Sequence, residues 1–236
     1  MARISRHELK TDEFVSGMDV AYEYYLQHRH AVLTTVVVVL VIAGLGWGGY
    51  SWQKHRSAQA DALLTAALAT YHAPVGTPAA PGQTSYGTVA QRAQAAQPQF
   101  QKVGDSYPHT FAADLAGYYL GLTQGDSGDL SGAEKTLQAV TAGRDVNVQA
   151  LARQGLAQLY AQEGKPELAQ QQLRSLIGNK SETVPSGLAT FELAQMEQDS
   201  NPGDAIKLYR QVKLEYPNSS MAQQADQQLA TLSGKH

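Results

Sequence analysis

The chain contains 236 residues with a formal net charge of −3, which is enough for one or two domains with a hydrophobic core. With only 18 Lys and Arg residues, a phosphate-binding or nucleic-acid-binding surface is not expected. The absence of cysteine excludes disulfide bonds, thiolate catalysis and lipid attachment through cysteine.

Residues 1–30 form a short polar tail in which five residues follow helical spacing: Phe14, Met18, Tyr22, Tyr25 and Arg29. This spacing is typical of a juxtamembrane amphipathic helix, and it fits equally well a membrane helix that continues into water. The tail carries four Lys and Arg residues, against two in the 20 residues after the next segment. The positive-inside rule therefore predicts a cytoplasmic N-terminus.

The next segment, residues 31–50, reads AVLTTVVVVLVIAGLGWGGY and contains no charge. As an α-helix it is about 30 Å long, which matches the hydrocarbon thickness of a bilayer. A single span must be helical, because in lipid every backbone polar group has to be satisfied internally. Trp47, Tyr50 and Trp52 predict an aromatic belt at the far membrane interface. These features predict a single transmembrane helix over residues 31–52.

A cleaved signal peptide is the alternative, because Ala58-x-Ala60 resembles a cleavage site. The charged region ahead and the apolar run itself are both longer than in signal peptides, which favours an uncleaved anchor. Inside the span, Gly44-x-x-x-Gly48 has the spacing of a face for close helix packing in lipid, although glycine is also ordinary in membrane helices. The neighbouring letters GLGWGG do not form a phosphate loop, since no strand precedes them.

Beyond the span, residues 57–236 are expected to be entirely helical. Residues 57–73 read as a helix with small and apolar faces, and a Pro-rich segment at 74–85 is expected to be a mobile loop. From there to the end, apolar-periodic stretches alternate with short breaks rich in Gly, Pro, Asp and Ser. No stretch shows sustained period-two alternation, so the predicted fold class is all-α.

The helices repeat with a period of 36 or 37 residues. Ala96, Ala133, Ala169 and Ala205 open successive second helices, and their spacings add up to 109. The same offset superposes two longer stretches, which share an aromatic residue, a valine, a Tyr-Pro pair and an alanine: Phe100, Val103, Tyr107-Pro108 and Ala116 on Tyr209, Val212, Tyr216-Pro217 and Ala225. Because proline cannot continue a helix, each Tyr-Pro pair predicts the end of a second helix.

The clearest unit is LAQLYAQEGKPELAQQQLRSL, which resembles the tetratricopeptide repeat. In that repeat a small residue (here Ala157) lets two helices approach, an aromatic (Tyr160) fills the gap and a glycine (Gly164) turns the chain. The preceding unit fits with Gly121 but has Gln124 in place of the aromatic. The predicted architecture is a transmembrane helix followed by a tetratricopeptide-like solenoid.

The two ends of the solenoid depart from the pattern. In the first unit the Pro-rich segment replaces the turn, and Pro98 lies close to Ala96. The second helix there is therefore expected to start late or to kink. After Pro217, the last helix has a glutamine-rich outer face, which suits a cap without a further neighbour.

No catalytic, cofactor or metal site is expected, because no His lies near a second His or a carboxylate at metal-ligand spacing within a folded unit. The candidate site is a partner-binding groove on the inner curve of the solenoid, at fixed offsets from the packing Gly or Ala. Its predicted lining is Tyr118, Leu122, Gln154, Gln158, Phe191, Gln195 and Gln198. This amide-rich lining favours an extended or apolar peptide; a solvated face without a partner is the alternative.

Residues 57–236 carry 12 Lys and Arg against 16 Asp and Glu, a net charge of −4. This balance argues against binding of nucleic acid or anionic lipid through the repeats. The sequence shows no candidate nucleophile or acid–base pair, so an enzyme is the least supported class of function. No small-molecule substrate is expected. Protein partners are the expected ligands.

The layout is a short tail, a span that ends in Gly46-Trp47-x-x-Tyr50-x-Trp52, an alanine-rich helix, a gap and repeat-like helices. It resembles the bacterial inner-membrane family of ancillary SecYEG translocon subunits (the YfgM-like family) over nearly the whole chain. The resemblance implies a periplasmic repeat domain at 57–236, partners among Sec channel subunits and periplasmic chaperones, and assistance to secreted client polypeptides. The family has no catalytic motif, so no site residue is carried over.

A membrane-tethered periplasmic scaffold for cell-wall or outer-membrane assembly is the alternative function. The Tyr-Pro closures also resemble repeats of outer-membrane assembly and cell-division coordinator proteins, which are lipoproteins or soluble periplasmic proteins. The lack of cysteine and the uncleaved span argue against those two classes. A translocon subunit is expected to need Gly44 and Gly48, or the N-terminal tail, to dock on a membrane partner, whereas a scaffold is expected to tolerate a foreign span.

Overall fold

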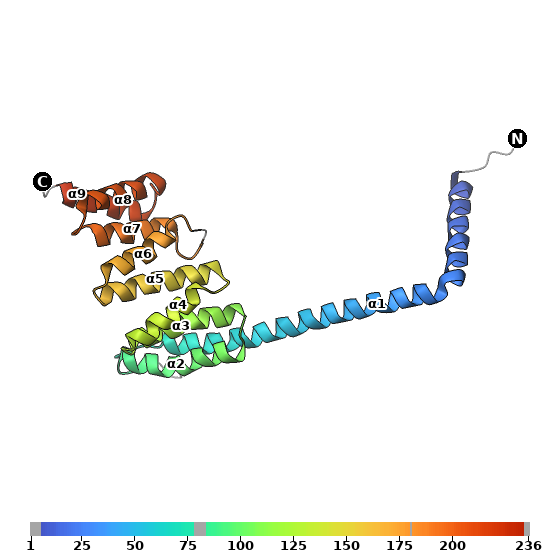
Figure 1. Ribbon diagram of the computed structural model, residues 1–236, viewed down its shortest axis with the longest axis horizontal. Helices are drawn as coiled ribbons and strands as arrows, with labels where there is room; N and C mark the ends of the chain where they lie inside the picture. Colours follow the sequence, from blue (N-terminus) through green and yellow to red (C-terminus); the bar gives the residue numbers. More distant parts are fainter. Residues whose placement is uncertain (1–5, 78–83, 180, 234–236) are drawn as a thin grey trace. The chain divides into compact units, whose positions relative to one another are not determined.

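The computed structural model describes residues 6–77, 84–179 and 181–233, without the side chains of residues 6–28 and Val32 (Figure 1). Within these ranges the regular secondary structure is α-helical, apart from one isolated bridge between Val75 and Tyr86, which confirms the all-α prediction. The helices are α1 (Arg6–Tyr71), α2 (Val89–Ser106), α3 (Phe111–Asp126), α4 (Leu130–Thr141), α5 (Val146–Gln162), α6 (Pro166–Leu176), α7 (Ser186–Glu197), α8 (Pro202–Glu215) and α9 (Ser220–Ser233).

The chain divides into two structural units, Met1–His55 and Arg56–His236. Helix α1 contributes to both, because it runs without interruption from Arg6 to Tyr71. In the first unit, the large apolar side chains between residues 33 and 52 are 49% to 77% exposed. This helix is long and apolar enough to cross a membrane, although a signal sequence has the same properties. Thr34 and Thr35 donate to the carbonyls of His30 and Ala31, so their hydroxyls are satisfied within the helix.

The second unit is a stack of antiparallel helix pairs (Figure 1). The pairs are the C-terminal part of α1 with α2, then α3 with α4, α5 with α6 and α7 with α8, followed by α9 alone. Consecutive helices from α2 to α9 pack against each other, and α3 also contacts α5, as α7 contacts α9. The first helices of three neighbouring pairs, α3, α5 and α7, lie next to one another, since α3 contacts α5 and Gln154 of α5 donates a hydrogen bond to Glu192 of α7.

Four buried clusters follow the stack and join neighbouring pairs. Ala96, Ala133, Ala169 and Ala205, which set the period in the sequence, are each at most 1% exposed. A methyl group is the largest side chain that fits where two helices of a pair approach closely. The regular spacing of these alanines therefore reports the regular spacing of the helix pairs.

The expected roles of the small and turn residues are confirmed in the middle repeats. A Cβ atom built on Gly121 would lie 2.7 Å from Cγ of Leu137, so only glycine lets α3 approach α4 this closely. Gly128 and Gly164, in the turns after α3 and α5, have φ of 91° and 70°. This left-handed conformation strains residues that carry a Cβ atom.

The two Tyr-Pro closures have nearly the same geometry, 109 positions apart. Tyr107 ends α2 with φ −129° and ψ 50°, and Tyr216 ends α8 with φ −130° and ψ 51°. Three residues on, the hydroxyls of Thr110 and Ser219 donate to the carbonyls of these tyrosines at 2.8 and 2.7 Å. The same hydroxyls accept from backbone N–H groups of the next helix at 3.2 and 3.1 Å. Each closure thus ends one helix and caps the next.

We expect Thr110→Ala and Ser219→Ala each to lower the free energy of unfolding by about 1 kcal/mol, because each removes a helix N-cap. Thermal unfolding of the full chain in detergent, followed by circular dichroism, measures the loss. Thr65→Ala is the matched control, since the Thr65 hydroxyl is exposed within α1 and only bonds the carbonyl of Asp61. Equal stability of all three variants would contradict the capping role.

Of the two alternatives expected at Pro98, a late start of the second helix is wrong, and a kink stays a prediction. Helix α2 does not start late: it begins at Val89 and continues past Pro98 to Ser106. The side chain of Thr88 accepts from the backbone N–H of Gln91 at 3.1 Å and so caps this earlier start. The buried face of Ala93, Ala96 and Phe100 offsets the backbone hydrogen bond that Pro98 cannot make.

The expected loop at 74–85 lies partly outside the described residues, since positions 78–83 are not included. Its two described ends are joined by backbone hydrogen bonds, from Gly76 to the carbonyl of Tyr86 and from Tyr86 to that of Pro74. These hydrogen bonds hold the segment that follows α1 next to the segment that precedes α2.

Candidate protein-interaction groove

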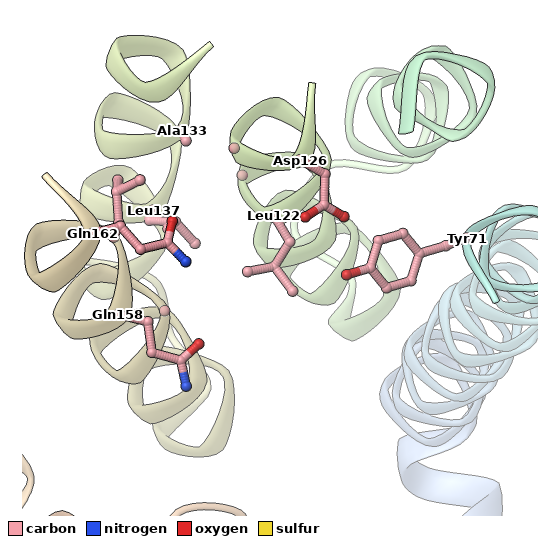
Figure 2. Close-up of a pocket in the computed structure, with 11 residues that line it drawn as sticks. Tyr71, Leu122, Asp126, Ala133, Leu137, Gln158 and Gln162 are labelled. Carbon is pink, nitrogen blue, oxygen red and sulfur yellow. The ribbon is translucent and has the colours of Figure 1, made fainter. Parts of the chain in front are cut away.

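Two pockets lie along the face formed by the first helices of the pairs. The first, of about 220 Å³, lies between Tyr71 at the end of α1, Leu122 and Asp126 of α3, and Gln158 and Gln162 of α5 (Figure 2). Its remaining lining is small or apolar: Gly121, Gly125, Ala133, Leu137, Gly155 and Leu159. We call it the α3–α5 pocket.

The second pocket, of about 290 Å³, lies between α5 and α7, and we call it the α5–α7 pocket. Its polar side chains are Gln158, Glu192 and Gln195. Its apolar lining consists of Ala157, Ala161, Leu173 and Met196. Gln158 lines both pockets, so the two are adjacent on either side of this residue and together form the groove.

The sequence pattern and the structure agree on several lining residues. Leu122 and Gln158 line the α3–α5 pocket, and Gln158 and Gln195 line the α5–α7 pocket. Gln154 is not in either lining, but its amide donates to Glu192 at the edge of the second pocket. These four residues come together because they lie on facing sides of α3, α5 and α7.

The other three predicted residues lie elsewhere. Phe191 is only 5% exposed, and its ring packs edge-on against Tyr209 in the core, so the offset rule misplaces it. Gln198 ends α7 and accepts a hydrogen bond from the Tyr209 hydroxyl at 3.0 Å. Tyr118 is partly buried and packs against the cluster around Leu137 and Leu156. None of these three side chains lines either pocket.

Tyr71, Asp126 and Glu192 are among the lining residues that the sequence pattern missed. Asp126 lies four residues after Leu122, and Glu192 three residues before Gln195. Helical spacing from the predicted positions would therefore have found both carboxylates. Tyr71 has no such signal, because it belongs to a different helix from its neighbours in the pocket.

Asp126 of the α3–α5 pocket has a cationic neighbour, Arg92, that does not line the pocket. A guanidinium nitrogen of Arg92 lies 3.8 Å from its carboxylate, and the same guanidinium lies over the Tyr71 ring, 5.1 Å from its centroid. Burial raises the pKa of Asp126, and the Arg92 charge opposes this. Arg92 thus compensates this carboxylate from within the repeat.

Glu192 has a different environment. Its carboxylate accepts a hydrogen bond from the Gln154 amide at 2.9 Å. Burial raises the pKa of Glu192, and the bond from Gln154 lowers it by less. The ion pairs of the described residues do not include this side chain.

We expect the stability of the repeat domain to fall at high pH partly because of Tyr118. Burial, with smaller effects of Tyr119 and Tyr71, raises the pKa of its phenol from 10.0 to about 12. The folded state therefore holds this proton more tightly than the unfolded chain does. The stability it contributes is fully present below pH 10 and is lost as the pH rises toward 12. Tyr118→Phe should therefore show a smaller fall in melting temperature over this range, and identical pH profiles would contradict the assignment.

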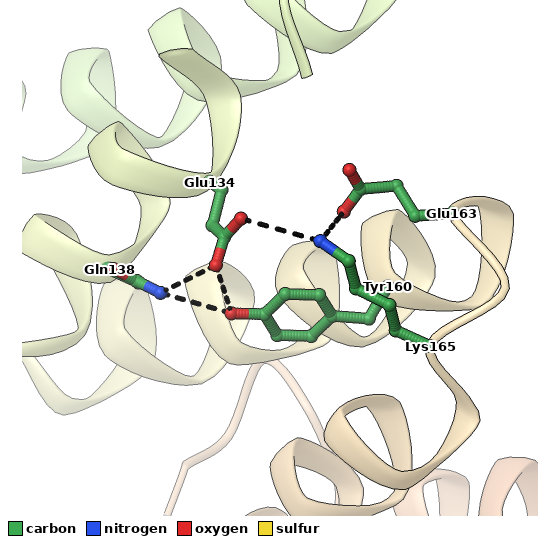
Figure 3. Close-up of polar contacts among 5 residues, drawn as sticks. All are labelled: Glu134, Gln138, Tyr160, Glu163 and Lys165. Carbon is green, nitrogen blue, oxygen red and sulfur yellow. Dashed lines mark hydrogen bonds and ion pairs between the residues drawn. The ribbon is translucent and has the colours of Figure 1, made fainter. Parts of the chain in front are cut away.

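A separate polar network joins α4, α5 and the start of α6 (Figure 3). The hydroxyl of Tyr160 donates to Glu134 at 2.9 Å, and the Gln138 amide donates to both. Lys165 pairs with Glu163 at 3.1 Å and with Glu134 at 4.0 Å. None of these five residues lines the groove, so the network holds neighbouring repeats together.

The next repeat makes the same connection with different residues. Glu197 takes the place of Tyr160 and forms an ion pair with Arg174, which takes the place of Gln138. Gln124, the equivalent residue in the preceding repeat, has a buried carbonyl oxygen without a partner among the described residues. The position that carries an aromatic in tetratricopeptide repeats thus links α5 to α4 and α7 to α6.

In the described part of the chain, no group of three or more His, Asp or Glu side chains could hold a metal ion. The predicted membrane residues lie on the first unit. A Cβ atom added to Gly44 or Gly48 would meet no atom within 4 Å, so the face around them is open. Trp47, Tyr50 and Trp52 are all exposed.

Comparison with known proteins gives one family. The model of the tetratricopeptide repeat-like domain matches residues 23–182 of the chain. The matched range begins in α1 and ends between α6 and α7, and the same pattern of helix pairs continues beyond it through α7 and α8. The chain has no significant match among curated proteins or among solved structures.

Proposed function

Because the chain belongs to the tetratricopeptide repeat-like domain family, we propose that it is a non-enzymatic protein-interaction module held at a membrane by its N-terminal helix. The observation that carries this proposal is the continuity of α1, which contains both the exposed apolar stretch and the first helix of the repeat domain. Since repeats of this kind present concave surfaces for other polypeptides, the groove is the proposed binding face.

The proposed topology follows the charge distribution around the apolar stretch. Residues 1–30, with four Lys and Arg residues, are cytoplasmic; residues 31–52 cross the bacterial inner membrane; residues 57–236 are periplasmic. The exposed Trp47, Tyr50 and Trp52 support an interfacial belt at the periplasmic end. The uncharged apolar surface of this helix supports a lipid environment, because in water it would remain unburied.

The finer proposal is that the protein associates with the Sec translocon and with periplasmic chaperones, and assists secreted polypeptides as they emerge. Its support is the layout of tail, span and repeats, which resembles the ancillary translocon subunits. In this arrangement the open face at Gly44 and Gly48 docks on a membrane subunit, while the groove binds a chaperone or client polypeptide.

The test is a pull-down of the tagged chain from its own membranes in mild detergent, with mass spectrometry. We expect Sec channel subunits and periplasmic chaperones in the wild-type sample, and fewer channel subunits with Gly44→Leu/Gly48→Leu. Gly46→Leu/Gly49→Leu is the matched control, because it adds the same bulk at two other open glycines of the span. Recovery of cell-wall or outer-membrane assembly proteins, unaffected by either variant, would contradict the translocon proposal and favour a tethered scaffold.

A further inference from the structure

The charged side chains that line the groove are all acidic. Asp126 lines the α3–α5 pocket and Glu192 lines the α5–α7 pocket. Neither lining contains a Lys, Arg or His residue. This differs from the nearly uncharged lining that the sequence pattern predicted, because the charge of the groove lining is negative.

The two carboxylates differ in how their charge is compensated. Asp126 has the Arg92 guanidinium 3.8 Å away, and Arg92 itself is not in the lining of the groove. Within the described ranges, Glu192 accepts a hydrogen bond from the neutral amide of Gln154 and takes part in no ion pair. By contrast, Glu134, Glu163 and Glu197 each contact a Lys or Arg side chain.

Resting on the proposed function, we infer that the groove recognises an extended polypeptide segment carrying a Lys or Arg side chain, which pairs with the Glu192 carboxylate in the α5–α7 pocket. The proposed partner is therefore an extended polypeptide that carries a cationic side chain, rather than a purely apolar segment.

The α5–α7 pocket has a contact for both the aliphatic stem and the charged end of a Lys or Arg side chain. Ala157, Ala161, Leu173 and Met196 offer an apolar lining for the aliphatic stem. Glu192 offers the carboxylate for the ammonium or guanidinium group at its end. A partly buried carboxylate without a cation is costly, and a cation that enters the same pocket removes that cost. Burial raises the pKa of Glu192, in agreement with an uncompensated charge.

The glutamines that line the pocket can form hydrogen bonds with the backbone of the bound polypeptide. Gln158 and Gln195 are exposed and line the pocket from α5 and α7. An amide side chain offers both donors and an acceptor, so it can pair with the N–H and C=O groups of an extended strand without regard to its sequence. Because Gln158 also lines the α3–α5 pocket, the strand can continue along the groove past one residue.

The test uses the full chain in nanodiscs of phosphatidylcholine, which has no net charge and does not attract cationic peptides. The probes are two fluorescein-labelled, end-capped peptides of alanine and serine, identical except for a central Lys or a central Gln. Fluorescence anisotropy measures their affinities. We expect the Lys peptide to bind about tenfold more tightly, since a charge-assisted hydrogen bond in a partly buried site has about this effect.

Two variants locate the effect. Glu192→Gln keeps the size of the side chain and its contact with Gln154, and should abolish the preference for Lys. Glu167→Gln is the matched control, because Glu167 is exposed on α6 outside both pockets, and the preference should remain. The melting temperature of each variant shows whether the repeat domain is intact.

The outcomes separate this inference from the proposed function. Equal binding of the Lys and Gln peptides, or a Lys preference that survives in Glu192→Gln, would overturn the inference and leave the groove as a peptide site. Failure of the wild-type chain to bind either peptide would contradict both the inference and the proposed use of the groove. Loss of the preference in Glu192→Gln alone would establish Glu192 as the group that recognises the basic side chain.

Discussion

Tyr209→Ala is expected to lower the free energy of unfolding of the repeat domain by about 4 kcal/mol, the cost of removing a large buried aromatic side chain. Tyr209 is 0% exposed, and its ring packs edge-on against Phe191 at 5.6 Å between centroids. It lies in the cluster that joins α7, α8 and α9, so the truncated side chain leaves a cavity that three helices cannot close. Denaturant unfolding of the full chain in detergent measures the loss.

Two further variants separate the ring from its hydroxyl and from its repeat position. Tyr209→Phe keeps the ring and removes only the hydrogen bond to Gln198, so it should cost about 1 kcal/mol. Phe100→Ala should cost nearly as much as Tyr209→Ala, because Phe100 occupies the equivalent position in the first repeat and is 1% exposed. A small loss for Tyr209→Ala, near that of Tyr209→Phe, would contradict the core assignment.

Gly121→Val is the second large effect, with an expected loss of about 3 kcal/mol from overpacking. A Cβ atom at this position would lie 2.7 Å from Cγ and 2.8 Å from Cδ2 of Leu137, inside the contact between α3 and α4. The two helices must separate to accept the added atoms, and the α3–α5 pocket, which both residues line, changes with them. The midpoint of chemical unfolding, measured as for Tyr209, reports the loss.

Gly104→Ala is the matched control with the opposite sign. Gly104 lies within α2, and a Cβ atom there would meet no atom within 4 Å. Replacing an unconstrained helical glycine with alanine should therefore stabilise the domain by about 0.5 to 1 kcal/mol. If both glycine variants were destabilised equally, close packing at Gly121 would not be the cause.

Much of the fold could be predicted because each repeat makes the same contacts and therefore has the same residue types at the same spacing in the sequence. The spacing of Ala96, Ala133, Ala169 and Ala205 follows from one requirement, a small residue where the helices of a pair meet. The helix ends at the two Tyr-Pro pairs could also be predicted, because proline cannot continue a helix. The late helix start expected at Pro98 was wrong for the same reason, since the helix there continues and buried side chains on both sides of the proline stabilise it.

The groove was predicted less well, because a sequence pattern gives the faces of one helix but not how the next helix covers them. Phe191 and Gln195 lie on the same short helix, yet α8 covers the first and leaves the second open. The link between α6 and α7 is a further example: Asn147 of α5 accepts hydrogen bonds from Ser181 and from the backbone of Glu182, more than 30 positions away. Contacts between distant segments of this kind leave no periodic signal.

The electrostatic character of the groove also escaped the pattern. Counting charges over residues 57–236 gave a slightly acidic domain, but it did not show that Asp126 and Glu192 line the pockets whereas Arg92 lines neither. The arrangement depends on which residues of α3 and α7 turn inward. The ligand that we propose therefore carries a basic side chain, whereas the sequence pattern favoured an extended or apolar peptide.

The central claim, that the groove is the surface that binds partner polypeptides, is tested most directly by site-specific photo-crosslinking in native membranes. A photo-reactive phenylalanine derivative is placed at Gln158, at Gln195, or at Glu167 on the outer helix α6. We predict protein adducts from Gln158 and Gln195 that the soluble Lys peptide competes away, and none from Glu167. Adducts only from Glu167, or adducts from the groove that the peptide does not reduce, would contradict the claim.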